Sequence, residues 1–257
     1  MTQITILFTC LWAVKTAAAF LPSPSHHHHH HHHHHHGSVI SINSGSSSSS
    51  IKTSLNAAIF ETPRTLVNKG MQSFQNYDVP TSLAYFDKAD AALPDGSLKP
   101  YLWQRGISYY YLDRFQEGSD QFRLDVSVNP LDVEEIVWDI ACLARMNNGG
   151  DEFPPERRMA LPEGRKDRRR IMGTVYSLFR GDGMMEYDLR KAGHEGNVSD
   201  EFYSLFYLGL YCEVRNETSK AETYMREAAN SAYATGNGAG DYMSACAKVH
   251  CKLRGWV

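Results

Sequence analysis

The sequence predicts an all-α fold built from repeated pairs of helices. Apolar residues recur at helical spacing through most of the chain, as in Leu102, Gly106 and Tyr109, which lie four and three positions apart. Glycine and proline fall between these segments, and the alternating patterns of strands are scarce. In three places a glycine at position i is followed by a large apolar residue at position i+16, which indicates that a helix-turn-helix unit repeats.

Residues 1–60 differ from this helical body. Residues 4–14 form an apolar stretch that is too short to span a bilayer, and three alanines follow soon after it. We therefore expect residues 1–19 to be a signal peptide, with no transmembrane helix in the mature chain. Residues 20–60 contain eleven consecutive histidines, many serines and no acidic residue, which predicts a disordered, low-complexity leader.

The junction after Ala19 gives this leader a second feature. Three alanines followed by Phe20, Leu21 and Pro22 resemble the junction of bipartite plastid-targeting presequences in algae with secondary plastids, whose acid-poor transit segment begins at phenylalanine. The resemblance implies a plastid (chloroplast) destination through the secretory route. Lys52 is the only lysine or arginine in residues 20–60, which departs from that pattern, so secretion into the endomembrane lumen stays the alternative.

The rest of the chain, residues 61–257, is long enough for one sizeable core. The formal net charge of the full chain is −3, so no overall positive charge indicates a nucleic-acid partner. Four cysteines lie on helical patterns without a CxxC pair, and we expect buried thiols. These are Cys142, Cys212, Cys246 and Cys251.

Two consecutive helix pairs are expected first, followed by a third near the C-terminus. Gly70 and Phe86 are the i and i+16 residues of the first pair, and Gly106 and Phe122 are those of the second. A small glycine lets the second helix of a pair approach the first closely. Between the helices of the second pair, Asp113 begins the pattern of a capping box.

The third pair is expected at residues 202–235, where Gly209 and Met225 have the same spacing. Residues 132–146 predict the first helix of a degenerate repeat between the second and third pairs. A last helix over residues 241–253 is typical of the capping helix that covers the open end of an array.

These spacings resemble the tetratricopeptide (TPR) pattern, in which W-x2-L-G-x2-Y is followed by A-x3-F and a proline within about 34 residues. In the second pair, Gly106, Tyr109, Phe122 and Pro130 match that pattern. The resemblance implies a right-handed α-solenoid of TPR-like repeats over residues 61–257, with a degenerate middle repeat and a C-terminal capping helix.

Two charged residues of the second pair depart from the TPR pattern. Arg105 occupies the position of the family's leucine, and Asp125 occupies that of an alanine. The resemblance implies that the two positions face one another, and an unpaired charge there would be costly. We therefore expect an ion pair between Arg105 and Asp125.

The resemblance also implies a concave binding surface formed by the first helix of each repeat. Aromatic residues are typical anchors of such surfaces. We expect an open groove that takes a helix or an extended peptide of a protein partner; the alternative is that the same residues pack against the chain's own later helices. The groove residues are Val67, Met71, Phe74, Trp103, Ile107, Tyr110, Tyr111, Tyr203, Phe206 and Leu210.

A loop at residues 147–168 interrupts the helical pattern, and loops of this length are often functional. Basic residues gather at its end, and arginine suits carboxylate and phosphate partners. The alternative is an ordinary solvated loop. The candidate residues are Arg165, Lys166, Arg168, Arg169 and Arg170.

Sequence motifs for catalysis are missing. There is no Walker loop and no GxGxxG, and the lone pair of Cys246 and His250 is better explained by core packing than by zinc. We expect no cofactor, no metal and no DNA partner. The favoured function is a protein-binding adaptor in the assembly or maintenance of an organellar complex. An RNA-binding plastid repeat protein, with too few repeats for base-by-base reading, and a helical enzyme of unrecognised type are the alternatives.

Overall fold

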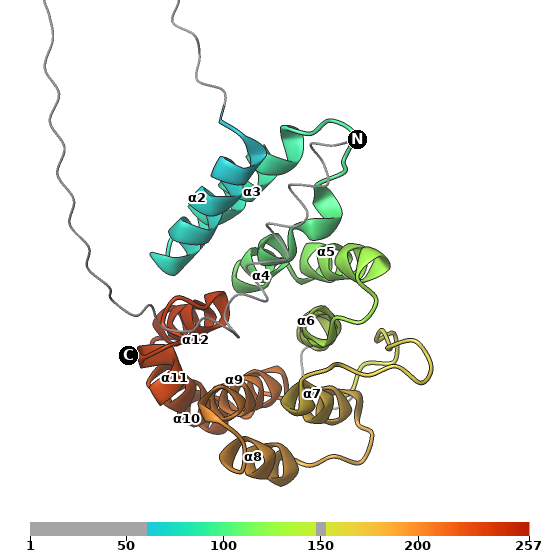
Figure 1. Ribbon diagram of the computed structural model, residues 1–257, viewed down its shortest axis with the longest axis vertical. Coiled ribbons are helices and arrows are strands. Elements are labelled where there is room, and N and C mark those ends of the chain that lie inside the picture. Colours follow the sequence, from blue (N-terminus) through green and yellow to red (C-terminus); the bar gives the residue numbers. More distant parts are fainter. Residues whose placement is uncertain (1–60, 148–152, 257) are drawn as a thin grey trace, which may run out of the picture.

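The computed structural model describes residues 61–147 and 153–256. The expected signal peptide and low-complexity leader lie outside these residues. The described part of the chain is all-α and contains no strand (Figure 1). None of its helices is both long enough and apolar enough to cross a bilayer.

The described helices follow one another along the chain and pack as sequential pairs, which confirms the predicted all-α fold of helix pairs. They are α2 (Pro63–Gln75), α3 (Val79–Ala91), the 3-10 helix η2 (Lys99–Tyr101), α4 (Trp103–Tyr111), α5 (Phe115–Val128), α6 (Val133–Met146), α7 (Arg170–Arg180), α8 (Glu186–His194), α9 (Val198–Val214), α10 (Thr218–Ala229), α11 (Ala232–Thr235) and α12 (Tyr242–Arg254).

Three of these pairs, α2–α3, α4–α5 and α9–α10, share one packing contact. A glycine of the first helix lies directly against a large side chain of the second. A Cβ atom added at any of these glycines would lie 2.7 to 2.9 Å from that side chain, closer than side chains pack. The glycine spacing seen in the sequence therefore corresponds to a real contact. The three contacts are Gly70–Phe86, Gly106–Phe122 and Gly209–Met225.

The turns of the same three pairs are also equivalent. Tyr77, Asp113 and Asn216 lie at position i+7 from the glycine of their pair and have positive φ angles of 65°, 56° and 60°. This left-handed conformation is uncommon outside glycine, so its recurrence identifies one turn type. It also corrects the capping prediction, because α5 begins after Arg114 and has no side-chain cap.

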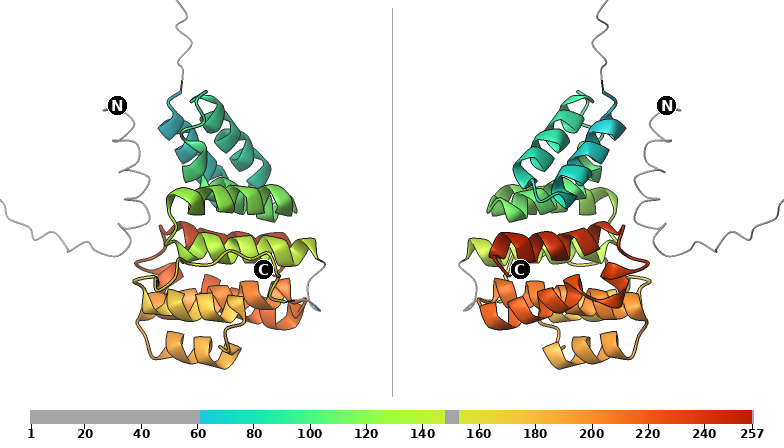
Figure 2. Two further views of the ribbon diagram at one scale, coloured as in Figure 1. Left: turned by 90° about the vertical axis from the view of Figure 1, so that its right-hand side faces the viewer. Right: turned by 90° about the vertical axis from the view of Figure 1, so that its left-hand side faces the viewer.

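The last helix of the chain packs against the first. Figure 1 shows α12 between α2 and the α9–α10 pair, and it contacts both α2 and α10. Tyr242 of α12 stacks on Phe74 of α2 with ring centroids 5.0 Å apart, and meets Trp103 of α4 edge-on at 5.3 Å. In Figure 2, α12 and α6 lie at the same level on opposite sides of the molecule. α12 therefore packs on both α10 and α2, the first helix of the described residues.

Trp138 of α6 is the centre of the aromatic core. Its ring contacts Tyr110 of α4 at 5.1 Å, and Phe122 of α5 and Phe206 of α9 at 6.1 Å each. All four side chains are almost completely buried. Helices α4, α5, α6 and α9 thus share one apolar interior, and a second, smaller cluster lies between α2, α3 and the start of α4.

The predicted ion pair between Arg105 and Asp125 is wrong. Arg105 instead binds two carboxylates of the preceding helix α3, with its Nε 2.9 Å from Asp87 and its Nη1 3.1 Å from Asp90. Asp125 is buried within α5. The reason is that α3 packs directly on α4 and presents these two carboxylates to the guanidinium.

We expect Gly106→Ala to lower the free energy of unfolding by about 1–3 kcal/mol, because its new methyl group would overlap the Phe122 ring. Phe122 is fully buried and stacked on Trp138, so it cannot move aside easily. The matched control is Gly173→Ala in α7, where an added Cβ meets open space. It should stabilise by up to about 1 kcal/mol through helix propensity. Urea denaturation measures the free energy of unfolding of both variants. If both variants were more stable than the wild type, or both less stable, the packing of Phe122 on Gly106 would be contradicted.

Candidate binding cavity

The aromatic face that was expected to form an open groove is filled by the chain itself. Tyr242 covers Phe74, and Trp138 covers Tyr110 and Phe206. The expectation of an open groove is thus corrected, and the alternative of packing against later helices is what the structure shows. The buried groove residues are Val67, Phe74, Trp103, Ile107, Tyr110, Tyr111, Phe206 and Leu210, whereas Met71 and Tyr203 are partly buried.

A buried carboxylate holds this filled face together. Glu213 of α9 accepts hydrogen bonds from the Tyr110 hydroxyl and from Nε of Arg254, both at 2.6 Å. Nε2 of His250 and Nη1 of Arg145 each lie 3.4 Å from Oε1 of the same carboxylate. Helices α4, α6, α9 and α12 therefore meet at one side chain.

The charge of Glu213 depends on these neighbours. Burial alone would raise its pKa, but His250, Arg254 and the Tyr110 hydroxyl outweigh burial and hold the pKa of Glu213 well below its ordinary value. Burial and the nearby carboxylate in turn raise the pKa of Tyr110, which keeps its hydroxyl a donor. Ionised Glu213 is thus part of the folded structure at neutral pH.

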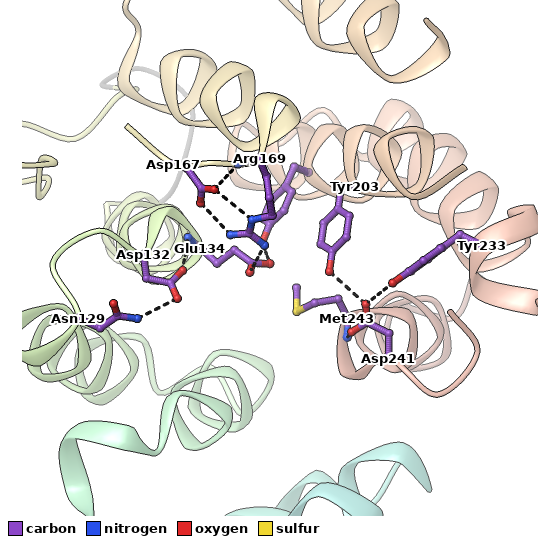
Figure 3. A network of polar contacts seen from close by, with 10 residues as sticks. Asn129, Asp132, Glu134, Asp167, Arg169, Tyr203, Tyr233, Asp241 and Met243 are labelled. Carbon is purple, nitrogen blue, oxygen red and sulfur yellow. Dashed lines mark hydrogen bonds and ion pairs between the residues drawn. The ribbon is translucent and has the colours of Figure 1, made fainter. Parts of the chain in front are cut away.

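A cavity of about 310 Å³ remains between α6 and the start of α12. Figure 3 shows this region, with Glu134 and Arg169 on one side and Asp241 and Met243 on the other. The lining residues come from five helices and from the segments that precede α7 and α12. They are Met71, Trp103, Glu134, Glu135, Trp138, Arg169, Tyr203, Asn237, Gly238, Gly240, Asp241, Tyr242 and Met243.

One wall of the cavity carries an ion pair. Nη1 of Arg169 lies 2.8 Å from Oε2 of Glu134, and the Tyr207 hydroxyl donates to the other oxygen of Glu134 at 2.9 Å. Nη2 of Arg169 also binds Asp167 at 2.8 Å. Although burial lowers the pKa of Arg169, the charges of Glu134 and Asp167 raise it overall. This guanidinium is therefore fixed by carboxylates of its own chain.

The opposite wall is formed by Asp241. Its Oδ1 caps α12 by accepting from the Met243 amide at 3.0 Å. Its Oδ2 accepts from the hydroxyls of Tyr203 at 3.1 Å and Tyr233 at 2.8 Å (Figure 3). These partners are all neutral, and the described residues place no cation in an ion pair with Asp241.

The cavity unites parts of the two predicted sites. Met71, Trp103 and Tyr203 come from the predicted groove, and Arg169 comes from the predicted basic loop. The other basic-loop residues do not line it and are exposed: Arg165, Lys166, Arg168 and Arg170. Glu134, Asp241 and Trp138 complete the cavity, and they were not among the residues predicted to form a site.

One group of possible metal ligands lies elsewhere. Single ligand atoms of Glu186, Cys212 and Glu217 lie within 4.8 Å of one another. Lys220 already binds both carboxylates, with Nζ 3.2 Å from Glu186 and 2.6 Å from Glu217. Burial and the two carboxylates raise the pKa of Cys212 to about 12, so its thiol is protonated at neutral pH. An ammonium group thus occupies the position a metal would need.

We expect Glu213→Gln to lower the free energy of unfolding by about 2–4 kcal/mol at pH 7, because Arg254 and Arg145 lose a buried counter-charge. Since the folded pKa lies below the unfolded value of about 4.3, ionised Glu213 stabilises the fold above that value and the stabilisation is lost as pH falls.

The difference between the wild type and this variant should therefore shrink when unfolding is measured at pH 3. The control is Glu227→Gln, whose side chain is 47% exposed, and it should change stability by less than about 0.5 kcal/mol. A Glu213→Gln effect that is small at pH 7, or that persists undiminished in acid, would contradict this role.

Compared with models of known protein families and with curated proteins, the chain matches none of them. The resemblance to the TPR family therefore stays a prediction from the sequence spacing.

Proposed function

We propose that this protein is a protein-binding adaptor, and that its helix pairs are TPR-like repeats of a solenoid whose inner face is closed by α12. The partner would bind at the mouth of the cavity. The observation that carries this proposal is the cavity itself, where aromatic side chains of the predicted binding face stay in contact with open space. Three of its lining residues, Met71, Trp103 and Tyr203, come from that face.

The size of the cavity indicates how a partner would bind. At about 310 Å³, the cavity is at the small end of the range of ligand pockets, roughly 300–1,000 Å³. A single side chain can enter it while the partner's backbone lies across the mouth, beside the exposed residues Asn237 and Gly240. This supports recognition of an extended peptide segment.

The charge of the lining argues against RNA at this position. Glu134, Glu135 and Asp241 would repel phosphate groups, and Arg169 is already bound to Glu134 and Asp167. Nucleic-acid recognition requires available cationic groups. A protein partner is therefore the better-supported class.

Peptide selection tests the proposal. A display library of random dodecapeptides is selected against the full chain, and the affinity of enriched peptides is measured by calorimetry. We expect one peptide to bind per chain, and Gly240→Trp to weaken binding at least tenfold by filling the mouth of the cavity. The control is Gly173→Trp, which adds the same bulk where a Cβ also meets open space, and should change affinity less than twofold.

The proposal is wrong if no peptide is enriched above background. It is also wrong if the enriched peptides bind both variants with the same affinity, since they would then bind away from the cavity.

A further inference from the structure

The chemistry of the cavity lining indicates which side chain of a partner it accepts, an inference that rests on the proposed adaptor function. The lining contains three carboxylates, Glu134, Glu135 and Asp241, and one guanidinium, that of Arg169. Three negative charges and one positive charge leave a formal excess of two negative charges. The side chains of Glu134 and Glu135 are buried, so water screens their charge poorly.

Aromatic rings form the rest of the cavity. The rings of Trp103 and Tyr242 meet at 88° with centroids 5.3 Å apart, which gives the lining a corner of two perpendicular aromatic surfaces. Trp138 and Tyr203 line it as well. Aromatic faces attract cations electrostatically, and this attraction is stronger when the cation is desolvated. Aromatic rings combined with carboxylates are therefore a cation-binding environment.

One carboxylate of the lining already binds a cationic side chain of the chain itself. Arg169 places its guanidinium on Glu134, in a hydrogen bond of 2.8 Å. Across the cavity, Asp241 receives only the neutral donors Tyr203, Tyr233 and the Met243 amide. Its charge therefore has no cationic counterpart among the described residues, although it lies in a partly buried position. A cation supplied from outside would complete this second wall as Arg169 completes the first.

We propose that the cavity accepts a cationic side chain, that of an arginine or a lysine, from an extended segment of a protein partner. Both residue types combine a long apolar stem with a charged head group. The stem suits the aromatic lining, and the head group reaches the carboxylate of Asp241. An acidic side chain would be repelled by Asp241, and a neutral polar one would leave the charge of Asp241 without a cationic counterpart.

Short peptides of defined charge provide the first test. The peptides are acetyl-Gly-Gly-X-Gly-Gly-amide, in which X is arginine, lysine, citrulline or glutamate, so that X carries the only charge. Binding to the full chain is followed by calorimetry. We expect the arginine and lysine peptides to bind at least tenfold more tightly than the citrulline peptide, which has nearly the shape of arginine without its charge. Equal affinities for arginine and citrulline would overturn the proposal.

Asp241→Asn separates charge from structure. Asparagine caps a helix as well as aspartate does, and its amide NH2 can donate to a tyrosine hydroxyl at the Oδ2 position, so we expect a folded protein by circular dichroism. The preference for arginine over citrulline should fall below threefold. The control is Asp182→Asn, at a residue whose side chain is 49% exposed. This variant should keep the wild-type preference for the arginine peptide over the citrulline peptide. An unchanged preference in Asp241→Asn would overturn the role assigned to this carboxylate.

A second measurement needs no peptide. Gly240 lines the cavity, is exposed, and offers open space for a Cβ. We expect Gly240→Arg to melt measurably above Gly240→Gln, and Gly240→Glu to melt below it, because a positive charge at the mouth would be attracted by Asp241 and a negative charge repelled. The difference should shrink at high salt as screening increases. Equal melting temperatures, or the reverse order, would overturn the proposal.

These outcomes can be told apart from failure of the adaptor function. If library peptides bind at the cavity without a cationic residue, the adaptor function stands and the cation preference is wrong. If no peptide of any charge binds, the adaptor function is wrong, and the Gly240 variants still decide whether the cavity favours a positive charge.

Discussion

The contact of α12 with α2, the first described helix, determines which aromatic side chains of the described residues are buried. Tyr242 stacks on Phe74, and Glu213 fixes the far end of α12 through Arg254 while it also binds Tyr110 of α4. Moving α12 away from the other helices would separate Glu213 from Arg254 and expose the Phe74 side chain that Tyr242 covers. Removing one partner of a buried ion pair typically costs about 3–5 kcal/mol. The aromatic residues of the predicted groove are therefore mostly core, and the proposed binding site is the space that α12 does not fill.

Part of the wall of that space is formed by the residues that lead into α12. Gly238 and Gly240 line the cavity without side chains, and a Cβ at Gly240 would meet open space. Asp241 ends this segment and begins α12, and two tyrosine hydroxyls fix its carboxylate against the cavity. Asp241 thus caps α12 and also places a carboxylate in the cavity wall. The packing of α12 and the lining of the proposed site therefore depend on the same residue.

The helices and their pairing could be predicted from the sequence, because periodicity and the glycine spacing report local contacts such as Gly106 with Phe122. The face that each helix presents to distant helices could not be predicted from these local patterns. An aromatic residue such as Tyr110 fits an open groove and a closed core equally well, and the position of later helices, here α6 with Trp138, decides between them.

The same limit explains two further differences between the expectation and the structure. Arg105 binds Asp87 because α3 packs on α4, which the spacing within one pair does not report. Glu134 and Glu135, which were not predicted to form a site, are adjacent acidic residues at the start of a mostly apolar helix, and this pattern is the sign in the sequence that could have identified them.

The distance between α2 and α12 tests the closed arrangement most directly. Spin labels on cysteines introduced at the exposed Gln75 and Lys252, with Cys10 replaced by serine, report it by pulsed electron resonance, since the other native cysteines are buried. The closed fold predicts one narrow distribution at short distance, and a broad or long one, with α12 away from α2, would contradict it.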